Sequence, residues 1–393
     1  MTGARITVVG VGAPPLPPLA RQRLAAAVLV AGGERHLAEH APQGVPAVRL
    51  SGDLAPAIER LAAADGPAVV LASGDPGFFG IVRALAERVG RERLEVLPAV
   101  SSVSAAFARA GLPWDDALVV SAHGRAPAAA VSIALAHPKV AVLTAPAFGP
   151  AELARALGDA ERHLVVAERL GSGDERVVEG TPAAIGAARF ADPNVVLVLD
   201  PSRPGGGRST VWPPRGPTRW ALAEEEFDAD AGLITKREVR ALALARLGPG
   251  VGDLVWDVGA GSGSVAIECA RLGAFAVAVE RDAGACERIR ANAARHAVAL
   301  RIVQGEAPAA LADLPDPDAV FVGGAGAGLP AVLNAVLARQ ARAVVVALAT
   351  IERVAPAARA LADGGLAVDA VMLQASRLRP LGDATGLTAA NPV

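Results

Sequence analysis

The chain of 393 residues contains no tyrosine, and only 3% of its residues are aromatic. Its formal net charge is −2, and no part of the sequence forms a basic stripe. Because RNA-binding proteins need basic surfaces and aromatic side chains on which bases stack, this composition argues against a nucleic-acid partner. The charge also provides no field that would attract an acidic membrane. We therefore expect neither nucleic acid nor a membrane among the partners.

Cysteine is scarce as well, with only Cys269 and Cys286. Two cysteines cannot build a disulfide framework, and no Cys/His cluster has the spacing of zinc ligands. His36 and His40 have the i,i+4 spacing of metal ligands on a helix, but no third ligand is evident, so we expect no metal. The two cysteines fall in expected helices and are interpreted as small buried residues.

Long apolar runs are missing, although 52% of the residues are hydrophobic. The first apolar stretch ends at Pro14 and Pro15 and is too short for a signal peptide or a membrane span. The hydrophobic residues are mainly alanine and valine interrupted by glycine, proline and arginine, a pattern typical of buried parallel strands and alanine-rich helices. We expect a soluble, cytoplasmic protein.

The N-terminal half alternates short apolar runs with segments long enough for helices. This order predicts an α/β fold. The expected strands are 6–12, 68–73, 94–99, 117–122, 140–145, 163–168 and 194–200.

Residues 200–220 interrupt this alternation with a high density of glycine and proline. Such a segment supports neither a helix nor an interior strand, which favours a linker. The chain length predicts two domains. We place the first domain at 1–205, the linker at 206–220 and the second domain at 221–393. A long surface loop within one domain is the alternative.

The strand–helix alternation resumes after the linker, beginning with an expected helix at 236–247. It predicts a doubly wound, Rossmann-like parallel sheet, which binds ligands beyond the carboxyl ends of its strands. The segments that contain the expected strands are 254–264, 274–280, 299–307, 318–324, 341–348 and, late in the chain, 368–374. The acidic run at 224–230 is interpreted as a solvated segment.

The sequence DVGAGSGS at 257–264 lies at an expected strand-to-helix junction. Gly259, Gly261 and Gly263 allow a tight turn and a close approach of ligand to backbone. The positive end of the following helix suits a carboxylate. Glu280 ends the next strand, where its carboxylate can accept bonds from two ribose hydroxyls. The combination predicts a nucleoside-bearing ligand; a glycine turn that only packs the helix on the strand is the alternative.

A dinucleotide fingerprint requires glycine or alanine at its sixth position, where this chain has Ser264. The G-x-G-x-G spacing after Asp257 instead resembles motif I of the class I S-adenosylmethionine-dependent methyltransferases. The resemblance continues through Glu280 and the segment 305–307, where that family contacts adenine. It implies cofactor contacts from Gly259, Ala260, Gly261, Ser262, Gly263, Glu280, Glu306 and Ala307.

Three loops in the N-terminal half, 10–15, 72–80 and 97–107, each follow an apolar run and should meet at one edge of the sheet. The stretch Gly74 to Gly77 also fits a generic turn. Together the loops resemble those of class III tetrapyrrole methyltransferases, although Ala13 and Ala99 depart from that family's pattern. The resemblance implies a two-lobed class III methyltransferase fold for this half. It also implies a second cofactor site formed by Ser73, Gly74, Asp75, Phe78, Ser101 and Ser102.

A class III domain followed by a class I domain, with SAHGR (121–125), ITKREVR (234–240) and NPV (391–393), resembles the precorrin-6Y C5,15-methyltransferase (decarboxylating) family of cobalamin biosynthesis. The resemblance covers nearly the whole chain. It implies transfer of two methyl groups from S-adenosylmethionine to carbons 5 and 15 of a precorrin, with loss of the carboxyl group of the carbon-12 acetate (precorrin-6B to precorrin-8X). It also implies two S-adenosylmethionine sites and adds Thr235 to the C-terminal one.

A precorrin carries many carboxylates, whereas the chain has only two lysines. Arginine forks can bind carboxylates bidentately, so Arg125, Arg237 and the nearby His123 are candidate substrate contacts. Ordinary surface residues are the alternative.

We name no catalytic acid or base, since methyl transfer from a sulfonium depends mainly on orientation. We expect a homo-oligomer. An RNA methyltransferase and a non-catalytic nucleotide-sensing regulator are the rival functions.

Overall fold

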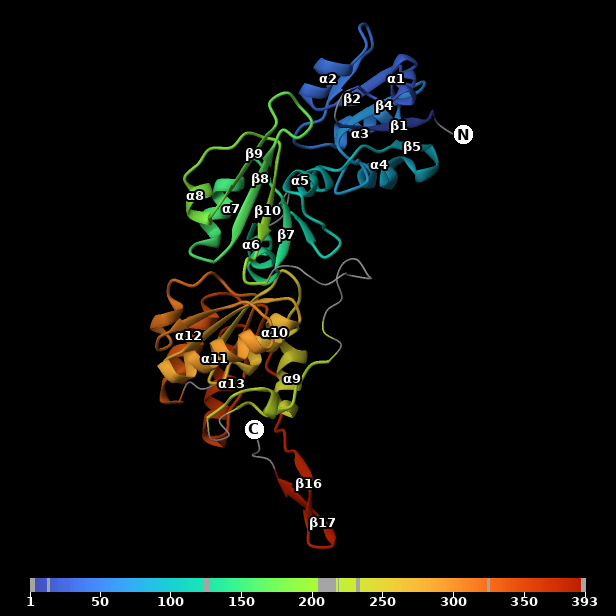
Figure 1. Cartoon of the computed structure of the whole chain (residues 1–393). Helices are drawn as coiled ribbons and strands as arrows, with labels where there is room; N and C mark the ends of the chain where they lie inside the picture. Colours follow the sequence, from blue (N-terminus) through green and yellow to red (C-terminus); the bar gives the residue numbers. More distant parts are fainter. Residues whose placement is uncertain are drawn as a thin grey trace. The chain divides into compact units, whose positions relative to one another are not determined.

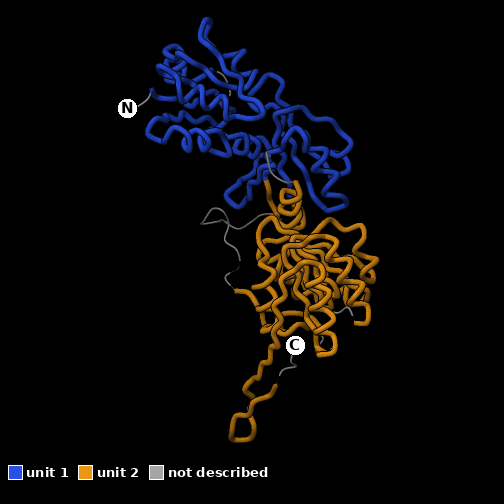
Figure 2. Tube along the Cα trace, turned by 180° about the vertical axis from the view of Figure 1, so that it is seen from behind, with its two compact units in different colours: residues 1–125, 141–199 blue, residues 126–140, 200–393 orange. Residues whose placement is uncertain are grey.

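A computed structural model describes residues 4–12, 15–122, 127–203, 217, 219–230, 234–323 and 326–389. The chain divides into two compact units (Figure 2). Unit 1 comprises residues 1–125 and 141–199, and unit 2 comprises residues 126–140 and 200–393. Both are α/β, which confirms the predicted fold class. The predicted boundaries 1–205, 206–220 and 221–393 stay a prediction.

Unit 1 begins with a five-stranded parallel sheet of order β3-β2-β4-β1-β5. All six residues of β1 are buried, as expected for a central parallel strand covered on both faces. The elements are β1 (Ile6–Val11), α1 (Pro18–Ala25), β2 (Leu29–Gly32), α2 (Glu34–His40), β3 (Ala47–Arg49), α3 (Ala55–Ala62), β4 (Ala68–Ser73), α4 (Val82–Val89) and β5 (Leu94–Leu97).

A second five-stranded sheet in unit 1 has the order β6-β7-β10-β8-β9, and in it β8 is antiparallel to both β10 and β9. The two sheets agree with the predicted two-lobed architecture of this half (Figure 1). The elements are α5 (Ser102–Ala110), β6 (Leu118–Ser121), β7 (Lys139–Leu143), α7 (Pro150–Leu157), β8 (His163–Glu168), β9 (Arg176–Gly180), α8 (Pro182–Gly186) and β10 (Asn194–Leu199).

Unit 2 contains a five-stranded parallel sheet of order β13-β12-β11-β14-β15, the predicted doubly wound arrangement. Helix α6 (Pro127–Ala136) belongs to this unit and contacts β12. The other elements are α9 (Arg237–Leu247), β11 (Leu254–Val258), α10 (Ser264–Arg271), β12 (Phe275–Glu280), α11 (Ala283–Arg295), β13 (Leu300–Gln304), β14 (Ala319–Val322), α12 (Leu329–Leu337), β15 (Ala343–Val346), α13 (Val354–Asp363), β16 (Ser376–Leu381) and β17 (Ala384–Ala389).

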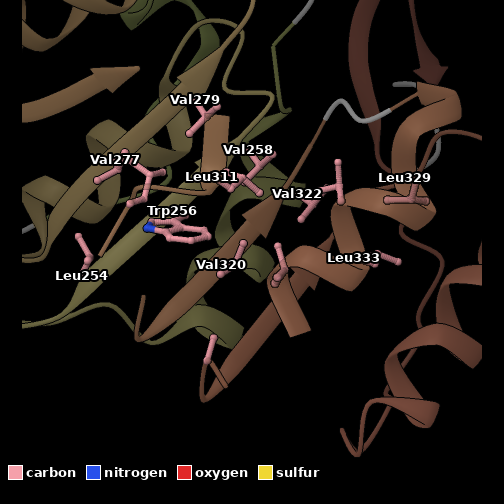
Figure 3. Close-up of a cluster of buried hydrophobic side chains, with 14 of the residues drawn as sticks. Leu254, Trp256, Val258, Val277, Val279, Leu311, Val320, Val322, Leu329 and Leu333 are labelled. Carbon is pink, nitrogen blue, oxygen red and sulfur yellow. The ribbon is translucent and has the colours of Figure 1, made fainter. Parts of the chain in front are cut away.

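Hydrophobic clusters cover both faces of this sheet because successive side chains of a strand point to opposite sides. Trp256 is fully buried in one cluster with Leu254 and Val320 (Figure 3). Val255, between Leu254 and Trp256 in β11, belongs to the other cluster. This two-sided burial explains why the strand sequences are continuous apolar runs.

The late strand expected at 368–374 is absent, which corrects that prediction. Residues 366–375 have no regular secondary structure, and a two-stranded hairpin, β16–β17, follows them. Val371 and Met372 are exposed, so the apolar pattern of this segment does not reflect burial within the chain. No helix in the described parts of the chain has the length and apolarity needed to cross a membrane.

Candidate functional site

The glycine loop of unit 2 connects β11 to α10 at the carboxyl edge of the sheet. Gly259, Gly261 and Gly263 have φ values of +74°, +57° and +74°, a region that side chains disfavour. A Cβ on Gly263 would lie 2.9 Å from Cγ2 of Ile289. The Gly259 N–H donates to the carbonyl of Val279 in β12 (2.9 Å), so the loop bends toward the end of the neighbouring strand.

Asn292 of α11 holds the other end of this loop. Its fully buried amide donates to the carbonyls of Ser262 (3.0 Å) and Asp228 (2.9 Å), and its Oδ1 accepts the Asp228 N–H (2.8 Å). The carbonyl of Ala260 accepts the N–H of Gly263 (2.8 Å) inside the loop. The predicted cofactor residues Ala260 and Ser262 therefore belong to one closed turn.

Glu280 extends from the end of β12 to the glycine loop. Its carboxylate accepts the backbone N–H groups of Gly261 (2.9 Å), Arg281 (2.8 Å) and Asp282 (3.0 Å). An ionised carboxylate has about four acceptor positions, so one is free for a ligand hydroxyl while these bonds persist, rather than the two that the sequence predicts. The residues present thus fit the ribose of a nucleoside.

The 305–307 loop lies next to Glu280. The Gly305 N–H donates to the carbonyl of Glu280 (2.9 Å). The Glu306 side chain is 75% exposed and lies 3.4 Å from Arg281, and Ala307 packs against the hydrophobic cluster around Trp256. The structure therefore brings the glycine loop, Glu280 and this loop to one edge of the sheet. Their contacts with a cofactor stay a prediction.

Asp257 precedes the glycine loop and is only 1% exposed. Its Oδ2 accepts the N–H of Ala266 in the first turn of α10 (2.9 Å). Burial raises the pKa of Asp257 to about 7; the Ala266 hydrogen bond opposes this shift, and the charge of Glu280 adds to it. The sequence motif locates Asp257 but does not reveal this shift, because the shift depends on burial, which residue spacing does not show.

Thr235 is tied to α10 through a buried ion pair. Arg240 Nε lies 3.0 Å from Glu268 Oε1, and both side chains are fully buried. Arg240 Nη1 donates to the carbonyl of Thr235 (2.6 Å), and Glu268 accepts the N–H of Leu222 (2.7 Å). The segments around Leu222 and Thr235 are therefore fixed to the helix that follows the glycine loop. Sequence reasoning missed this pair because its members are 28 positions apart.

The acidic run at 224–230 is not simply solvated, which corrects the prediction for Glu224. Its side chain is 13% exposed and lies 2.7 Å from Arg377 of β16. Burial raises the pKa of Glu224, but hydrogen bonds from Arg377 and from backbone N–H groups outweigh it and lower the pKa to about 2.

Arg237, a predicted substrate contact, is 47% exposed and lies 3.2 Å from Glu238. The other two candidates, His123 and Arg125, lie outside the described residues.

In unit 1 the three predicted loops meet at one edge of the first sheet, which confirms the expectation. A Cβ on Gly10 would lie 2.2 Å from the carbonyl oxygen of Gly74 and 2.5 Å from the backbone nitrogen of Ala99. The Gly74 N–H donates to the carbonyl of Val11 (2.8 Å), and Gly74 has a φ of +61°. Only a residue without a side chain permits this approach of the first two loops.

The remaining predicted residues of this site lie in or beside the same loops. The Asp75 carboxylate accepts the N–H of Gly77 (2.8 Å), which closes a turn. The Ser101 hydroxyl caps α5 by accepting the Ser104 N–H (3.1 Å). Ser102 begins α5, and the half-buried Phe78 packs against the core cluster around Phe107.

His36, whose spacing from His40 suggested only a metal ligand in the sequence, lies at this edge. Its Nε2 lies 2.8 Å from Oγ of Ser73, the last residue of β4. Burial lowers the pKa of His36 to about 4, with further lowering by Arg35 and His40. His36 lies in the first turn of α2, four positions after β2 ends. Because β2 was not among the expected strands, nothing in the sequence indicated that His36 lies at this edge. Within the described ranges, no group of three His, Cys, Asp or Glu residues could hold a metal ion.

Comparisons with known proteins agree with this division. Residues 5–185 match the family model of tetrapyrrole (corrin/porphyrin) methylases, and residues 225–393 match the model of the precorrin methyltransferase domain. Each unit has a parallel sheet with loops at its carboxyl edge, and each is matched by a methyltransferase family model. These features define a methyltransferase with two methyltransferase domains.

Similar proteins narrow the class further. A Sinorhizobium precorrin-6Y C(5,15)-methyltransferase [decarboxylating] is 38% identical over 99% of this chain and 94% of its own. The chain belongs to the precorrin-6Y C5,15-methyltransferase (decarboxylating) family. A probable cobalt-precorrin-6B C(15)-methyltransferase (decarboxylating) of Pyrobaculum calidifontis is 37% identical over 47% of this chain and 96% of its own. A cobalt-precorrin-7 C(5)-methyltransferase of Salmonella typhimurium is 35% identical over 50% of this chain and 98% of its own.

Proposed function

We propose that the chain transfers two methyl groups from S-adenosylmethionine to carbons 5 and 15 of a precorrin and removes the carboxyl group of the carbon-12 acetate. The observation that carries this proposal is the 38% identity to the Sinorhizobium relative, which extends over 99% of the chain and so includes both sites. S-adenosylmethionine supplies an electrophilic methyl group, so the proposed reaction uses no metal and no covalent bond to the protein.

Unit 2 would hold one donor molecule and carry out the carbon-15 step and the decarboxylation. The glycine-loop N–H groups and the start of α10 suit a carboxylate. Glu280 has a free acceptor position for a ribose hydroxyl, and Glu306 and Ala307 lie beside it for the adenine. The buried pair of Arg240 and Glu268 fixes the backbone at Thr235.

Unit 1 would hold the second donor molecule and methylate carbon 5. The close approach of Gly10, Gly74 and Ala99 forms a floor of backbone atoms at the sheet edge. Ser73, Asp75 and Phe78 line the loop that follows β4, and Ser101 and Ser102 begin α5 beside it. Two donor sites on separate sheets permit two methylations by one chain.

The substrate's carboxylates require cations, and Arg237 and Arg125 are our candidates. The side chain of Arg237 is 47% exposed although it is near Glu238, so a carboxylate of the substrate can reach it. Arg125, with His123, would serve the same purpose in the first domain. The chain's contribution to the chemistry is the orientation of a ring carbon in line with the donor's methyl group. We assign no catalytic acid or base.

We infer that the chain forms a homo-oligomer through the β16–β17 hairpin. Leu378 and Leu387 face each other across the hairpin, and each is 72% exposed. An isolated two-stranded hairpin is marginally stable in water, and further strands or a packing partner are needed to make it persist. A second copy that covers this leucine face would supply that partner.

Mass spectrometry of a precorrin incubated with the protein and S-adenosylmethionine tests the proposed function. The expected product is heavier by two methylene units and lighter by one carbon dioxide. Methylation of RNA, or binding of the donor without conversion of a precorrin, would contradict the proposal in favour of the rival functions.

A further inference from the structure

His36 and Ser73 form a hydrogen-bonded pair at the carboxyl edge of the first sheet in unit 1. His36 Nε2 and Ser73 Oγ are 2.8 Å apart. The two residues differ in accessibility: His36 is 5% exposed, whereas Ser73 is exposed at the end of β4. The pair therefore connects a buried imidazole to a hydroxyl that a ligand can reach.

The second ring nitrogen of His36 indicates the direction of this hydrogen bond. Nδ1 is buried and has no hydrogen-bond partner in the described part of the chain. Orphaned buried N–H groups are rarer than under-satisfied acceptors, so the neutral ring places its lone pair on Nδ1 and its proton on Nε2. The lowered pKa of His36, about 4, agrees with a neutral ring at neutral pH. Nε2–H then donates to Ser73 Oγ.

A Ser73 hydroxyl that accepts from His36 directs its own proton toward the ligand. The start of α5 lies close to Gly74, the residue that follows Ser73: a Cβ on Gly74 would be 3.3 Å from the backbone nitrogen of Ser102, the first residue of α5. The first N–H groups of a helix favour an acceptor with negative charge. Both observations point to an acceptor on the ligand, and a carboxylate fits best.

We propose that His36 is a positioning residue that makes the Ser73 hydroxyl a hydrogen-bond donor to a ligand carboxylate at the site in unit 1. This rests on the proposed function of unit 1 as a methyl-donor site. The carboxylate can come from two sources: the methionine part of the donor, or an acetate or propionate side chain of the precorrin.

The test uses the full-length chain carrying Gly261→Val, which removes the site of unit 2. The affinity for S-adenosylhomocysteine is measured by calorimetry, and the KM for the precorrin is measured in the carbon-5 methylation. Ser73→Ala and His36→Leu should each either weaken the affinity for S-adenosylhomocysteine or raise the KM for the precorrin by about tenfold, as expected for a hydrogen bond to a charged group. Both variants should change the same one of these two quantities. The double variant should be no worse than either single variant.

Two further variants separate positioning from a structural role. His36→Gln can present an amide N–H near the place of Nε2 and should restore the affected quantity to within about threefold of wild type. Glu34→Gln alters an exposed residue at the start of the same helix and should leave both quantities unchanged. A loss in His36→Gln equal to that in His36→Leu would overturn the proposal.

An analogue of S-adenosylhomocysteine without its carboxylate distinguishes the two sources. If the donor supplies the carboxylate, the Ser73→Ala chain and the chain with Ser73 intact bind the analogue equally well. If the precorrin supplies it, every variant binds S-adenosylhomocysteine normally, and only the KM for the precorrin rises.

Two outcomes separate this proposal from the proposed function. If Gly74→Val abolishes binding while Ser73→Ala and His36→Leu behave as wild type, the positioning role is wrong and the site assignment stands. If Gly74→Val also leaves binding unchanged, the donor site of unit 1 is itself wrong. Losses in Ser73→Ala and His36→Leu that multiply in the double variant would show that His36 does not act through Ser73.

Discussion

Asp257 and Glu280, at the carboxyl ends of neighbouring strands β11 and β12, occupy different environments. Asp257 is 1% exposed and receives one backbone N–H, whereas Glu280 receives three. Burial disfavours the charged form of a carboxyl group, and hydrogen bonds from N–H groups favour it. We therefore expect a substitution of Asp257 to change the stability of unit 2 and a substitution of Glu280 to change the affinity for the donor.

Asp257→Asn should change how the stability of unit 2 depends on pH. The pKa of Asp257 is about 7 in the folded chain and about 3.9 in an unfolded one, so between these values the folded state binds more protons and loses stability as pH rises. The asparagine side chain of the variant cannot titrate. As pH rises, the free energy of unfolding of the variant should therefore increase relative to that of the wild type, by about 1.4 kcal/mol for each pH unit in that interval. Hydrogen exchange of β11 and β12 peptides measures it, with the exposed Asp313→Asn as control.

Glu280→Gln should weaken donor binding in unit 2 at least about tenfold, because hydrogen bonds to a charged acceptor contribute about 1.5–3 kcal/mol. The amide would also direct an N–H group toward the backbone donors that the carboxylate now accepts. Calorimetry should show one weakened and one normal site. Glu287→Gln, an exposed residue of α11, is the control. Equal affinity in wild type and Glu280→Gln would mean that the ligand does not use this carboxylate.

Residues whose role depends on their place at a strand end were predictable, and residues whose role depends on burial were not. Gly261 and Glu280 could be located because a tight turn and a strand end leave a local signature. The pairing of His36 with Ser73 and the raised pKa of Asp257 depend on what surrounds each side chain in space, which the sequence pattern does not contain.

At the scale of elements, long apolar strands were predictable and short or exposed ones were not. β4 and β8 match the expected ranges because both are well-buried six-residue runs. β2 has four residues and β3 three, too few for a periodic signal, and both were missed. The expected strand at 368–374 was wrong because its apolar residues are exposed rather than packed within a sheet.

Arg240→Met should destabilise unit 2 by about 3–5 kcal/mol, because it leaves the buried carboxylate of Glu268 without its partner. Replacing both residues, as in Arg240→Met with Glu268→Leu, should cost less than the sum of the single changes. Hydrogen exchange of α9 and α10 peptides measures the effect. The control Arg290→Met breaks an exposed pair with Glu287 and should cost under about 1 kcal/mol. Equal effects of Arg240→Met and Arg290→Met would refute the structural role of the buried pair.

Leu378→Arg in β16 should reduce self-association, because it places a charge on the exposed leucine face of the hairpin. Sedimentation velocity over a series of protein concentrations measures the change. Arg379→Ser alters the opposite face of the same strand and is the control. The inferred role of the hairpin is wrong if the Leu378→Arg chain has the same mass in solution as the wild type.

At the scale of the whole molecule, the order of segments along the chain and the two compact units do not coincide. Helix α6 lies between β6 and β7 of unit 1 in sequence, yet Leu135 and Ala136 pack with the core cluster of unit 2. The sequence pattern indicated two α/β halves and a glycine- and proline-rich segment between them. It could not indicate that α6 packs in unit 2, since an alanine-rich helix has no side-chain pattern that selects one sheet over another.

The proposal of one donor site in each unit predicts that each site can be removed without the other. The wild-type chain should bind two molecules of S-adenosylhomocysteine. Gly74→Val and Gly261→Val place side chains at φ values of +61° and +57°, so each should remove one site by distorting its own loop. With a precorrin, Gly74→Val should lose the carbon-5 methyl group, and Gly261→Val should lose the carbon-15 methyl group. Calorimetry and mass spectrometry of the products measure both, and a single site that persists in both variants would contradict the assignment of one donor to each unit.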